Sequence, residues 1–345
     1  MYSAREQDAI LKELQANTGG DASKYEGTFE YDVLSSNSLE FAKQEVEREQ
    51  QYKAGFARTA WGEYLTMRAE EHGVVRKMAI KALGALTVTG SGTIPAGSLF
   101  ATTSGITFHA IKTTQVIQSA DIDIEAEAAG VAGNVAAGLI TVIPMSIPGI
   151  TRVTNAEATY DGFDEETDKA LYNRLIFKVQ QPATSGNEND YIEWGTSIEG
   201  VGRIAVKKLW NGNGTVKIIV TDANGQPASD NLLQQVRDYI AIQHPIGATV
   251  TVVAPEILAL SIALKPTIGT GNIGGIKTVL NAYFTSTDYD GIKISYAKIG
   301  ETILANSVET KVMDYDDLTV NGQKDNIAVT TEQIPSITEV ILTHG

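Results

Sequence analysis

Five carboxylates stand within eight residues of the chain and could either bind a metal ion or start a helix. They are Asp161, Asp164, Glu165, Glu166 and Asp168. Calcium loops place oxygen ligands at alternating positions around a sharp glycine turn, and the D-x-[DN]-x-[DN]-G spacing of such loops is absent here. Asp164 is instead predicted to cap a helix that begins at Glu165, because its carboxylate can accept a backbone N–H and the acids that follow favour the positive end of the helix dipole. The helix cap is the favoured interpretation, and a metal site at these acids is the alternative.

A glycine-rich segment at residues 269–278, GTGNIGGIKT, follows a predicted strand and opens a predicted helix. A phosphate-binding loop in this position needs a lysine directly after its last glycine, so that the ammonium reaches the phosphates that the backbone N–H groups surround. Here Ile276 separates Gly275 from Lys277. One inserted residue turns a side chain by about 100° around a helix. A flexible strand-to-helix turn is therefore predicted, and nucleotide binding is not.

Other catalytic and metal-binding patterns are also missing from the sequence. The nearest match to a G-x-S-x-G nucleophile turn, residues 195–199, lacks the closing glycine. The chain has no cysteine, and its four histidines form neither H-x-x-x-H nor H-E-x-x-H. Each histidine is expected to be a surface or turn residue: His72, His109, His244 and His344. We therefore expect no cofactor and no enzymatic activity.

Length and charge favour a multidomain protein whose partners are other proteins. With 345 residues and 43% hydrophobic content, the chain can bury the cores of two or three domains. Its 27 basic and 42 acidic residues give a formal net charge of −15, which repels a nucleic-acid backbone. The sequence contains no run of eighteen apolar residues and no basic-then-apolar leader. Neither membrane insertion nor a signal peptide is therefore expected.

Residues 1–82 are predicted to form an N-terminal helical region. A first short helix is expected to end at the Gly19-Gly20 pair. The segment 18–38 is rich in turn-forming residues and suits a connector. Ser38 is then predicted to cap a longer helix.

An apolar stripe continues from the end of that longer helix, with Gly73 as the expected stop. Residues on such a stripe can pack on the same chain, or they can contact partner subunits. We take the following five as candidate partner-contact residues: Tyr52, Phe56, Ala60, Tyr64 and Met67.

Residues 83–155 are predicted to form a small β-rich domain. Thr87 to Thr89 and Leu99 to Thr103 are strand formers. The Pro95-Ala96-Gly97 triplet between them indicates a turn. Glycine-rich spacing continues through the rest of this region, as expected for short strands joined by turns.

Two successive α+β modules are predicted for residues 156–255 and 256–345, since strand and helix patterns alternate throughout. The fold class is therefore α+β and multidomain. Trp210 stands at the end of a predicted strand, beside the turn Asn211-Gly212-Asn213-Gly214. It is expected to close over a hydrophobic core, and an exposed contact with sugar or protein is the alternative.

The segment Tyr160 to Val206 is predicted to be the joint between the β-rich domain and the first module. It contains a helix that Pro182 should end, and then a second helix with Tyr191 and Trp194 on one side. Gly200 and Gly202 should close that second helix and lead into a strand. Nothing in this order of elements requires catalysis.

Several separated motifs occur in one order along the chain. They are AWGEYLTMRAEEHGVVRKMA, GSGTIPAGSLF, GVAGNVAAG, GFDEETD, PATSGNENDY, GVGRIAV, LWNGNGTV and DNIAVTTEQIP. Each motif alone is nonspecific, because glycine-rich turns are common. Their joint order resembles the baseplate J-like family, the wedge proteins in the baseplates of contractile phage tails and related injection machines. One departure lies at Tyr172-Asn173-Arg174, where the family often has a more basic pattern and only Arg174 remains.

This resemblance implies a structural baseplate wedge component of a phage tail, or of a phage-tail-like particle such as a tailocin or other bacteriocin. In that family two copies associate with a smaller wedge protein through helical segments. The wedges surround the hub, usually in sixfold arrangement, and connect the sheath-proximal proteins and fibres to the tail tip. Self-association within this hetero-oligomer, assembly in the bacterial host cytoplasm and coupling of a receptor signal to sheath contraction are implied as well. No catalytic residue is implied.

Two other classes of function remain as alternatives at this point. A carbohydrate-binding tail adhesin would have repetitive β structure and clustered exposed aromatic residues, whereas aromatic residues make up only 7% of this chain. A soluble enzyme with an unrecognised site would bring titratable groups together in a pocket, whereas the acids found here stand at predicted turns and helix starts.

Overall fold

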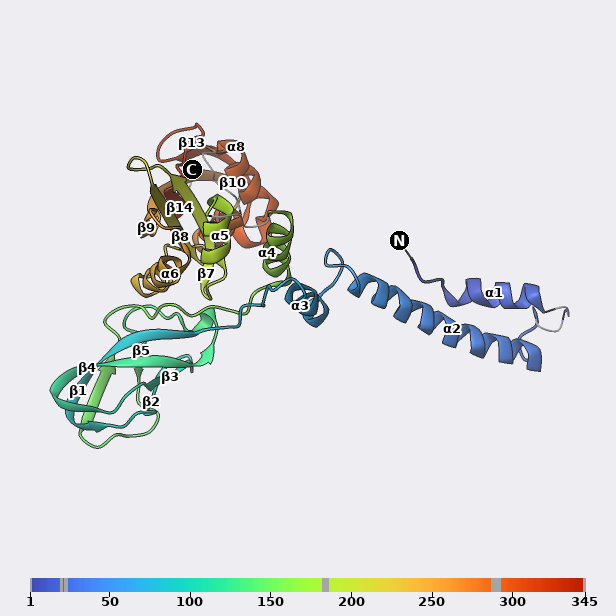
Figure 1. The fold of residues 1–345 in the computed structure, drawn as a ribbon, viewed down its shortest axis with the longest axis horizontal. Helices are drawn as coiled ribbons and strands as arrows, with labels where there is room; N and C mark the ends of the chain where they lie inside the picture. Colours follow the sequence, from blue (N-terminus) through green and yellow to red (C-terminus); the bar gives the residue numbers. More distant parts are fainter. Residues whose placement is uncertain (1, 19–20, 22–23, 182–185, 287–292, 344–345) are drawn as a thin grey trace. The chain divides into compact units, whose positions relative to one another are not determined.

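The computed structural model describes residues 2–18, 21, 24–181, 186–286 and 293–343 of the chain. Helices and several separate sheets confirm the predicted multidomain α+β class (Figure 1). The chain forms two compact units, which are described separately: Met1–Arg76 with Glu166–Gln180, and Lys77–Glu165 with Gln181–Gly345. Within the described ranges, no helix is both long and apolar enough to cross a membrane.

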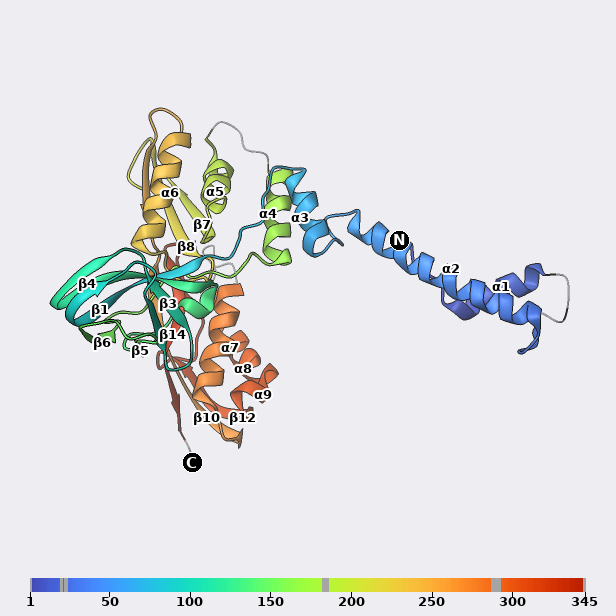
Figure 2. The same cartoon turned by 90° about the horizontal axis from the view of Figure 1, so that it is seen from below.

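The first unit is helical. It contains α1 (Gln7–Asn17), α2 (Phe29–Ala54), α3 (Gly62–Glu70) and α4 (Asp168–Gln180). Figures 1 and 2 show α1 lying alongside α2 as a helical hairpin. Gly19 and Gly20, where the first helix was expected to end, lie outside the described residues.

The N-cap of the long helix lies ten residues before the predicted cap. Thr28 is the N-cap of α2, because its hydroxyl accepts the N–H of Tyr31 at 3.3 Å. The expectation that Ser38 would cap this helix is wrong, and so is the connector predicted for the second half of residues 18–38. Ser38 is fully buried inside α2 and donates its hydroxyl to the carbonyl of Ser35 at 2.7 Å. A serine inside a helix can bond back to its own backbone in this way, so its presence alone does not mark a helix start.

Polar contacts hold the segment before α1 against α2. The Arg5 guanidinium binds Glu45 in the middle of α2, with Nε to Oε1 at 2.9 Å, and it also binds Glu13 of α1. The backbone N–H of Ala4 donates to Glu49 at 2.7 Å. Hydrogen bonds from Arg5 lower the pKa of Glu45 to about 2. These charge-assisted contacts fix how the N-terminal segment lies along α2.

A break separates α2 from α3, so the apolar stripe predicted from Tyr52 to Met67 does not run along one helix. The backbone N–H of Gly55 closes α2 by donating to the carbonyl of Gln51 at 3.1 Å. Gly62 then begins α3 with φ +50°, a left-handed conformation that favours glycine. Gly73, the expected stop, also has a positive φ of +69° and follows the end of α3.

The second unit begins with an antiparallel six-stranded sheet whose strand order is β5-β2-β3-β4-β1-β6. Its strands are β1 (Lys81–Ile94), β2 (Leu99–Thr102), β3 (Thr107–Ala110), β4 (Thr114–Ala129), β5 (Ile140–Val142) and β6 (Ile150–Thr154). The short η2 (Val131–Gly133) follows β4. The strands and the turn expected at residues 87–103 are all present, and Gly97 takes the positive φ that the turn requires, +83°. The sheet surrounds its own apolar core, which includes Leu86, Phe100, Phe108 and Ile124.

The first α+β module packs two helices on one face of a mixed three-stranded sheet. Its elements are α5 (Glu188–Thr196), β7 (Val201–Lys208), β8 (Thr215–Asp222), α6 (Asp230–Gln243) and β9 (Thr249–Val253). The central strand β8 pairs antiparallel with β7 and parallel with β9. As predicted, Tyr191 and Trp194 lie on one side of α5, with ring centroids 5.2 Å apart in edge-to-face contact. Pro182, the expected end of α4, lies outside the described residues.

The second module has the same mixed pattern around its central strand. It contains β10 (Glu256–Gly269), α7 (Ile273–Ser286), β11 (Lys293–Ile294), α8 (Tyr296–Ala305), α9 (Ser307–Thr310), β12 (Val312–Val320), β13 (Ile327–Ala328) and β14 (Gln333–Leu342). Strand β10 pairs antiparallel with β12 and parallel with β14. Residues of α7 and α8 cover one face of this sheet and share a core with Leu260, Ile262 and Leu264 (Figure 2). The loose likeness of the two modules in sequence therefore corresponds to a likeness in strand pairing.

Candidate partner-binding surface

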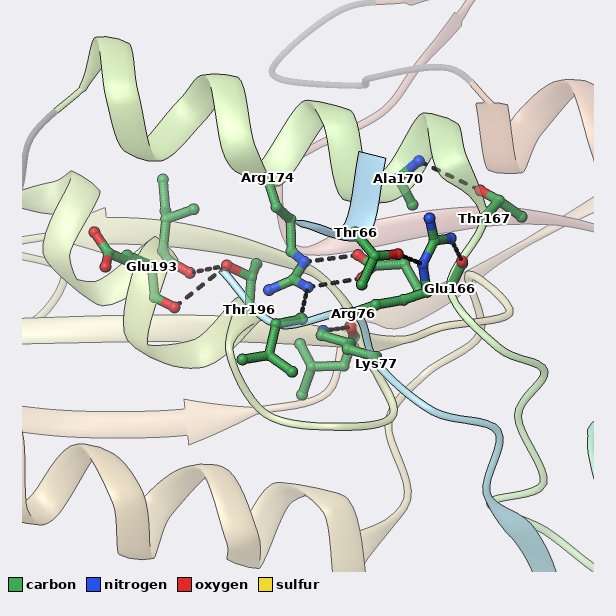
Figure 3. Close-up of polar contacts among 12 residues, drawn as sticks. Thr66, Arg76, Lys77, Glu166, Thr167, Ala170, Arg174, Glu193 and Thr196 are labelled. Carbon is green, nitrogen blue, oxygen red and sulfur yellow. Dashed lines mark hydrogen bonds and ion pairs between the residues drawn. The ribbon is translucent and has the colours of Figure 1, made fainter. Parts of the chain in front are cut away.

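Arg76 holds the beginning of α4 against α3. Its side chain is only 10% exposed. The guanidinium donates to the Thr66 hydroxyl at 2.8 Å and to the Gly62 carbonyl at 3.1 Å, both on α3. It also donates to the backbone carbonyl of Glu166 at 2.6 Å (Figure 3). A further bond, to the Asp168 carboxylate, is also 2.6 Å long. A planar guanidinium can serve several acceptors at once, and here it joins two segments about ninety residues apart.

A second arginine, Arg174 on α4, forms a two-pronged ion pair with Glu166. Its Nε and one terminal nitrogen lie 2.6 and 2.7 Å from the two carboxylate oxygens (Figure 3). The same terminal nitrogen donates to the Val75 carbonyl at 2.6 Å. The side chains of Glu166 and Arg174 are 6% and 19% exposed, so the pair is largely removed from water. We refer to Arg76, Arg174, Glu166 and Asp168 together as the arginine clasp.

Asp168 connects the first residues of α3 and α4 directly. Its carboxylate accepts the backbone N–H of Gly62 at 2.8 Å and also binds Arg76. The Gly62 N–H and the Arg76 guanidinium hold the pKa of Asp168 below its usual range. Thr167 supplies the cap of α4, since its hydroxyl accepts the N–H of Ala170 at 3.3 Å. The helix therefore starts three residues after the predicted start at Glu165.

An apolar core lies between α3 and α4 beneath these polar contacts. It consists of five buried residues: Leu65, Ala69, Val74, Leu171 and Leu175. Burial of each large apolar side chain contributes roughly 1.5–3 kcal/mol. Packing and the arginine clasp together give α3 a fixed orientation on α4.

The outer face of α3 carries large residues that do not pack on this core. Trp61, Tyr64 and Met67 are 40, 51 and 51% exposed. The rings of Trp61 and Tyr64 are in edge-to-face contact, with centroids 5.4 Å apart. Tryptophan, tyrosine and methionine are enriched where proteins bind one another. We call these three residues the α3 surface.

The predicted partner-contact residues divide among three places. Tyr52 and Phe56 lie at the end of α2 and just beyond it, with ring centroids 5.2 Å apart. Ala60 packs against the core between α3 and α4. Tyr64 and Met67 belong to the α3 surface. The sequence reasoning missed Trp61, although its position three residues before Tyr64 was a usable signal.

The five carboxylates of residues 161–168 bind different partners. Asp164 does not cap a helix, and that expectation is wrong. Its carboxylate accepts the N–H of Val131 at 2.9 Å, at the turn after β4. Asp161 accepts from the Ser229 hydroxyl at 2.8 Å, which lies at the start of α6. Among the residues that the structure describes, no three acids or histidines gather in a way that could hold a metal ion.

Asp222, at the end of β8, has the pKa that is shifted furthest among the described carboxylates of this module. Burial raises the pKa of Asp222 to about 6, and the nearby charge of Asp161 acts in the same direction. Hydrogen bonds from the backbone N–H groups of Gln226 and Asn224, at 2.7 and 2.9 Å, oppose the shift. The carboxylate stabilises the turn between β8 and α6, so its role here is structural.

Two further expectations from the sequence are wrong. His109 is not a surface turn residue: it lies in β3, its side chain is 22% exposed, and Nδ1 is 2.5 Å from the Glu127 carboxylate. Trp210 does not close over a core, since it is 37% exposed and packs its ring on the Lys217 ammonium at 4.2 Å. Leu209, with φ +55°, turns the chain before Trp210 and takes it out of the strand. His344 lies outside the described residues.

Comparison with known proteins identifies two regions of the second unit by family. Residues 85–162 match the baseplate J-like protein barrel domain, and residues 183–254 match the baseplate J-like central domain. The first region is the six-stranded sheet, and the second is the first α+β module.

Similarity to individual proteins extends over the whole chain. YqbT of Bacillus subtilis is 32% identical over 99% of this chain and 98% of its own length. The phage-like element PBSX protein XkdT, also of Bacillus subtilis, is 32% identical over the same shares of both chains. Baseplate protein gp47 of Escherichia phage Mu is 35% identical over 53% of this chain and 56% of its own length.

Proposed function

Because this chain belongs to the baseplate J-like family, we propose that it is a wedge component of a contractile tail or phage-tail-like particle. As a structural component of a phage-type baseplate, it would connect neighbouring proteins and not catalyse a reaction. In this proposal the wedge surrounds the hub and couples a signal from fibres or receptor to sheath contraction. Two stable arrangements of its interfaces would be needed for such coupling.

The observation that carries the proposal is the exposure of the apolar side chains of α2. This helix of 26 residues buries only Ser38 and Glu45. A helix that packs fully within its own chain buries an apolar stripe, and this one exposes six of its large apolar residues. They are Phe29, Val33, Leu39, Phe41, Val46 and Tyr52, each at least 41% exposed. Such a hairpin is expected to gain its hydrophobic contacts from another protein.

We place contacts with other baseplate proteins on α1, α2 and the α3 surface. The candidate partners are a smaller wedge protein, the hub and a sheath-proximal protein, in a sixfold assembly. Self-association is placed on the second α+β module, residues 256–345. The five predicted residues Tyr52, Phe56, Ala60, Tyr64 and Met67 remain candidates, and the exposure of Tyr52, Phe56, Tyr64 and Met67 supports them.

Purification of particles through a tag on the full chain tests the proposal. The tagged protein should carry the sheath, hub and neighbouring baseplate proteins with it, in amounts that fit a repeated wedge. Electron microscopy of the same sample should place the tag at the end of the tail. A tagged protein that accumulates outside tails, without these neighbours, would contradict the proposal.

A further inference from the structure

The chain contains four Asn-Gly pairs, and such a pair can lose its side-chain amide without an enzyme. The pairs begin at Asn211, Asn213, Asn224 and Asn321. Glycine has no Cβ, so its backbone nitrogen is open to approach by the neighbouring side chain. The four dipeptides are identical in sequence. They differ in structure, because each is held by a different set of hydrogen bonds.

Loss of the amide requires the two residues of the pair to react with each other. The glycine nitrogen gives its proton to water or hydroxide and attacks the asparagine Cγ, whose bond to Nδ2 breaks as ammonia leaves. The five-membered imide that forms then takes up one water molecule. Opening at Cγ gives aspartate, and opening at the main-chain carbonyl gives isoaspartate. A hydrogen bond that must break first should slow the reaction about two- to tenfold.

At Asn321, hydrogen bonds fix both ends of the side-chain amide. Its Nδ2 donates to the Ala259 carbonyl at 3.4 Å, and its Oδ1 accepts the N–H of Ser261 at 2.8 Å. Both partners belong to β10, the central strand of the second module. The Cγ atom of this residue is therefore held away from free rotation, and we expect the Asn321 pair to react slowly.

At Asn224, the attacking nitrogen itself is held. The N–H of Gly225 donates to the Asp222 carbonyl at 3.0 Å. The N–H of Asn224 donates to the Asp222 carboxylate at 2.9 Å, so the whole turn after β8 is fixed. The Gly225 nitrogen must leave its acceptor before it can attack, and this pair should react slowly as well.

The remaining two pairs follow one another in the turn between β7 and β8, and the first of them is tied to the hairpin. The N–H of Gly212 donates to the Leu209 carbonyl at 3.3 Å. The N–H of Asn211 donates to the Thr215 hydroxyl at 3.0 Å, and that hydroxyl donates to the Gly212 carbonyl at 2.7 Å. The Asn211 pair is therefore partly restrained.

The second pair in this turn, Asn213 with Gly214, is exposed and unrestrained at the reacting atoms. Within the part of the chain that the structure describes, neither the Asn213 side chain nor the Gly214 N–H forms a hydrogen bond with another residue. The Gly214 carbonyl accepts the N–H of Thr249 at 2.8 Å, so the chain is anchored just beyond the attacking nitrogen. Of the four pairs, this one has both reacting groups free.

From this difference we propose that Asn213 is a site of spontaneous modification, where one water molecule converts asparagine to aspartate or isoaspartate and ammonia is released. The product adds one negative charge to the turn. Isoaspartate also adds one carbon to the backbone between anchored points, since the N–H of Leu209 is bound to the Thr215 carbonyl at 2.8 Å. The turn must then change its shape. The inference goes beyond the proposed function and does not depend on it.

The test follows all four pairs in the full folded chain at mildly alkaline pH, by digestion and mass spectrometry. Cleavage after Lys208 and Lys217 releases residues 209–217, and fragmentation of that peptide separates Asn211 from Asn213. We expect Asn213 to lose its amide about two- to tenfold faster than Asn211, and at least that much faster than the other two. The control is the same chain in urea, where the hydrogen bonds are gone and this order should disappear.

Two variants test the assignment in the intact protein. Asn213→Gln keeps an amide, but its longer side chain would have to close a six-membered ring, which forms slowly. Isoelectric focusing should show much less of the acidic form in this variant than in the wild type. The matched control, Asn211→Gln in the same turn, should accumulate the acidic form as the wild type does.

Three outcomes would overturn the inference. In the folded chain, another Asn-Gly pair could react as fast as Asn213. Asn213 could keep its amide while the chain in urea loses it. The order of the four rates could also be the same in urea, which would show that hydrogen bonding does not select the site. None of these results bears on the proposed function, because no other baseplate protein takes part in the reaction.

Discussion

At the scale of single residues, the arginine clasp contains a charge pair, Arg174 with Glu166, that is largely removed from water. The Glu166 carboxylate is nearly excluded from water and faces a bidentate guanidinium. Removing one partner of such a pair is costly, because the other charge stays buried. Removing one charged side chain of the arginine clasp should therefore weaken the contact between α3 and α4.

We predict that Arg174→Gln lowers the free energy of unfolding of this helical pair by about 2–4 kcal/mol. Urea unfolding can follow it through Trp61 fluorescence in a background where Trp194 and Trp210 are phenylalanine. The control is Arg68→Gln, whose exposed pair with Glu71 should change stability by less than about 1 kcal/mol. Adding Glu166→Gln to Arg174→Gln should recover part of the loss, and no recovery would contradict a buried charge as the cause.

A second prediction at this scale concerns pH. Folding raises the pKa of Asp222 from 3.8 to about 6, mainly through burial. The folded state therefore binds its proton more tightly than the unfolded chain, and stability falls as the pH rises from about 4 to about 6. Asp222→Asn keeps an oxygen acceptor for the turn and removes the charge. It should stabilise the first module by about 1–3 kcal/mol at pH 8 and give no advantage near pH 4.

Unfolding temperatures between pH 4 and pH 8, followed by Trp194 fluorescence, measure this effect. Asp325→Asn removes an exposed carboxylate of the second module and should leave the pH profile of the first module unchanged. A constant difference between Asp222→Asn and wild type at every pH would show that the carboxylate does not titrate as described.

At the scale of elements, the six-stranded sheet depends on a close backbone crossing. A Cβ atom at Gly149 would lie 1.8 Å from the Ser91 carbonyl oxygen in β1, and this glycine has φ +82°. Gly138 has nearly the same φ, +79°, but a Cβ atom added there would meet no other atom within 4 Å. The two positions therefore share the same backbone conformation and differ in crowding.

We predict that Gly138→Ala costs about 1–2 kcal/mol from the left-handed backbone alone. Gly149→Ala should cost clearly more, since the backbone of β1 or of the loop must move, and overpacking of this kind adds about 1–3 kcal/mol. Thermal unfolding of both variants compares them directly. Equal losses would mean that the crossing can relax without cost.

The α3 surface gives a second prediction for an element. Tyr64→Ser with Met67→Ser should leave the helical unit folded, because both side chains are half exposed. Recovery of the partner baseplate proteins should fall about tenfold or more, as expected when an interface loses its central contacts. A matched control is Ile117→Ser with Met145→Ser, which removes exposed apolar side chains from β4 and from the loop between β5 and β6. Equal recovery by both double variants would argue against the α3 surface as a binding site.

At the scale of the whole molecule, the hairpin of α1 and α2 should be separable from the rest. Deleting residues 1–54 removes both helices and leaves α3, its core with α4 and the arginine clasp. A deletion of residues 1–82 would instead remove α3 and the first residues of β1. The shorter deletion is therefore the cleaner test.

We predict that the protein lacking residues 1–54 keeps the circular dichroism and unfolding transition of the second unit. It should no longer co-purify with the smaller wedge protein, because the exposed apolar residues of α2 are gone. Full-length protein carrying Arg174→Gln serves as a control for an indirect effect through the clasp. An intact complex after the deletion would contradict the assignment of hetero-oligomer contacts to this hairpin.

The family, the α+β class and most element types could be predicted from the order of residues alone. Alternating β-branched residues with glycine turns predicted the strands near residues 87–103, and a helix was predicted before Pro182, where α4 lies. These features are local, so short stretches of sequence are enough to specify them. The ordered motifs identified the family for the same reason, since each motif is a short run of residues that specifies its own local structure.

Packing in three dimensions settled where helices begin, which side chains stay exposed and what the charged residues bind. Ser38 and Asp164 are both residue types that favour a helix N-cap, but Thr28 and Thr167 cap the helices instead. Which of several possible caps is used depends on how the helix packs. Arg76 gave no local signal, since its partners lie up to about ninety residues away. Local preference fixes the type of each element, whereas contacts between distant residues determine its limits and its surface.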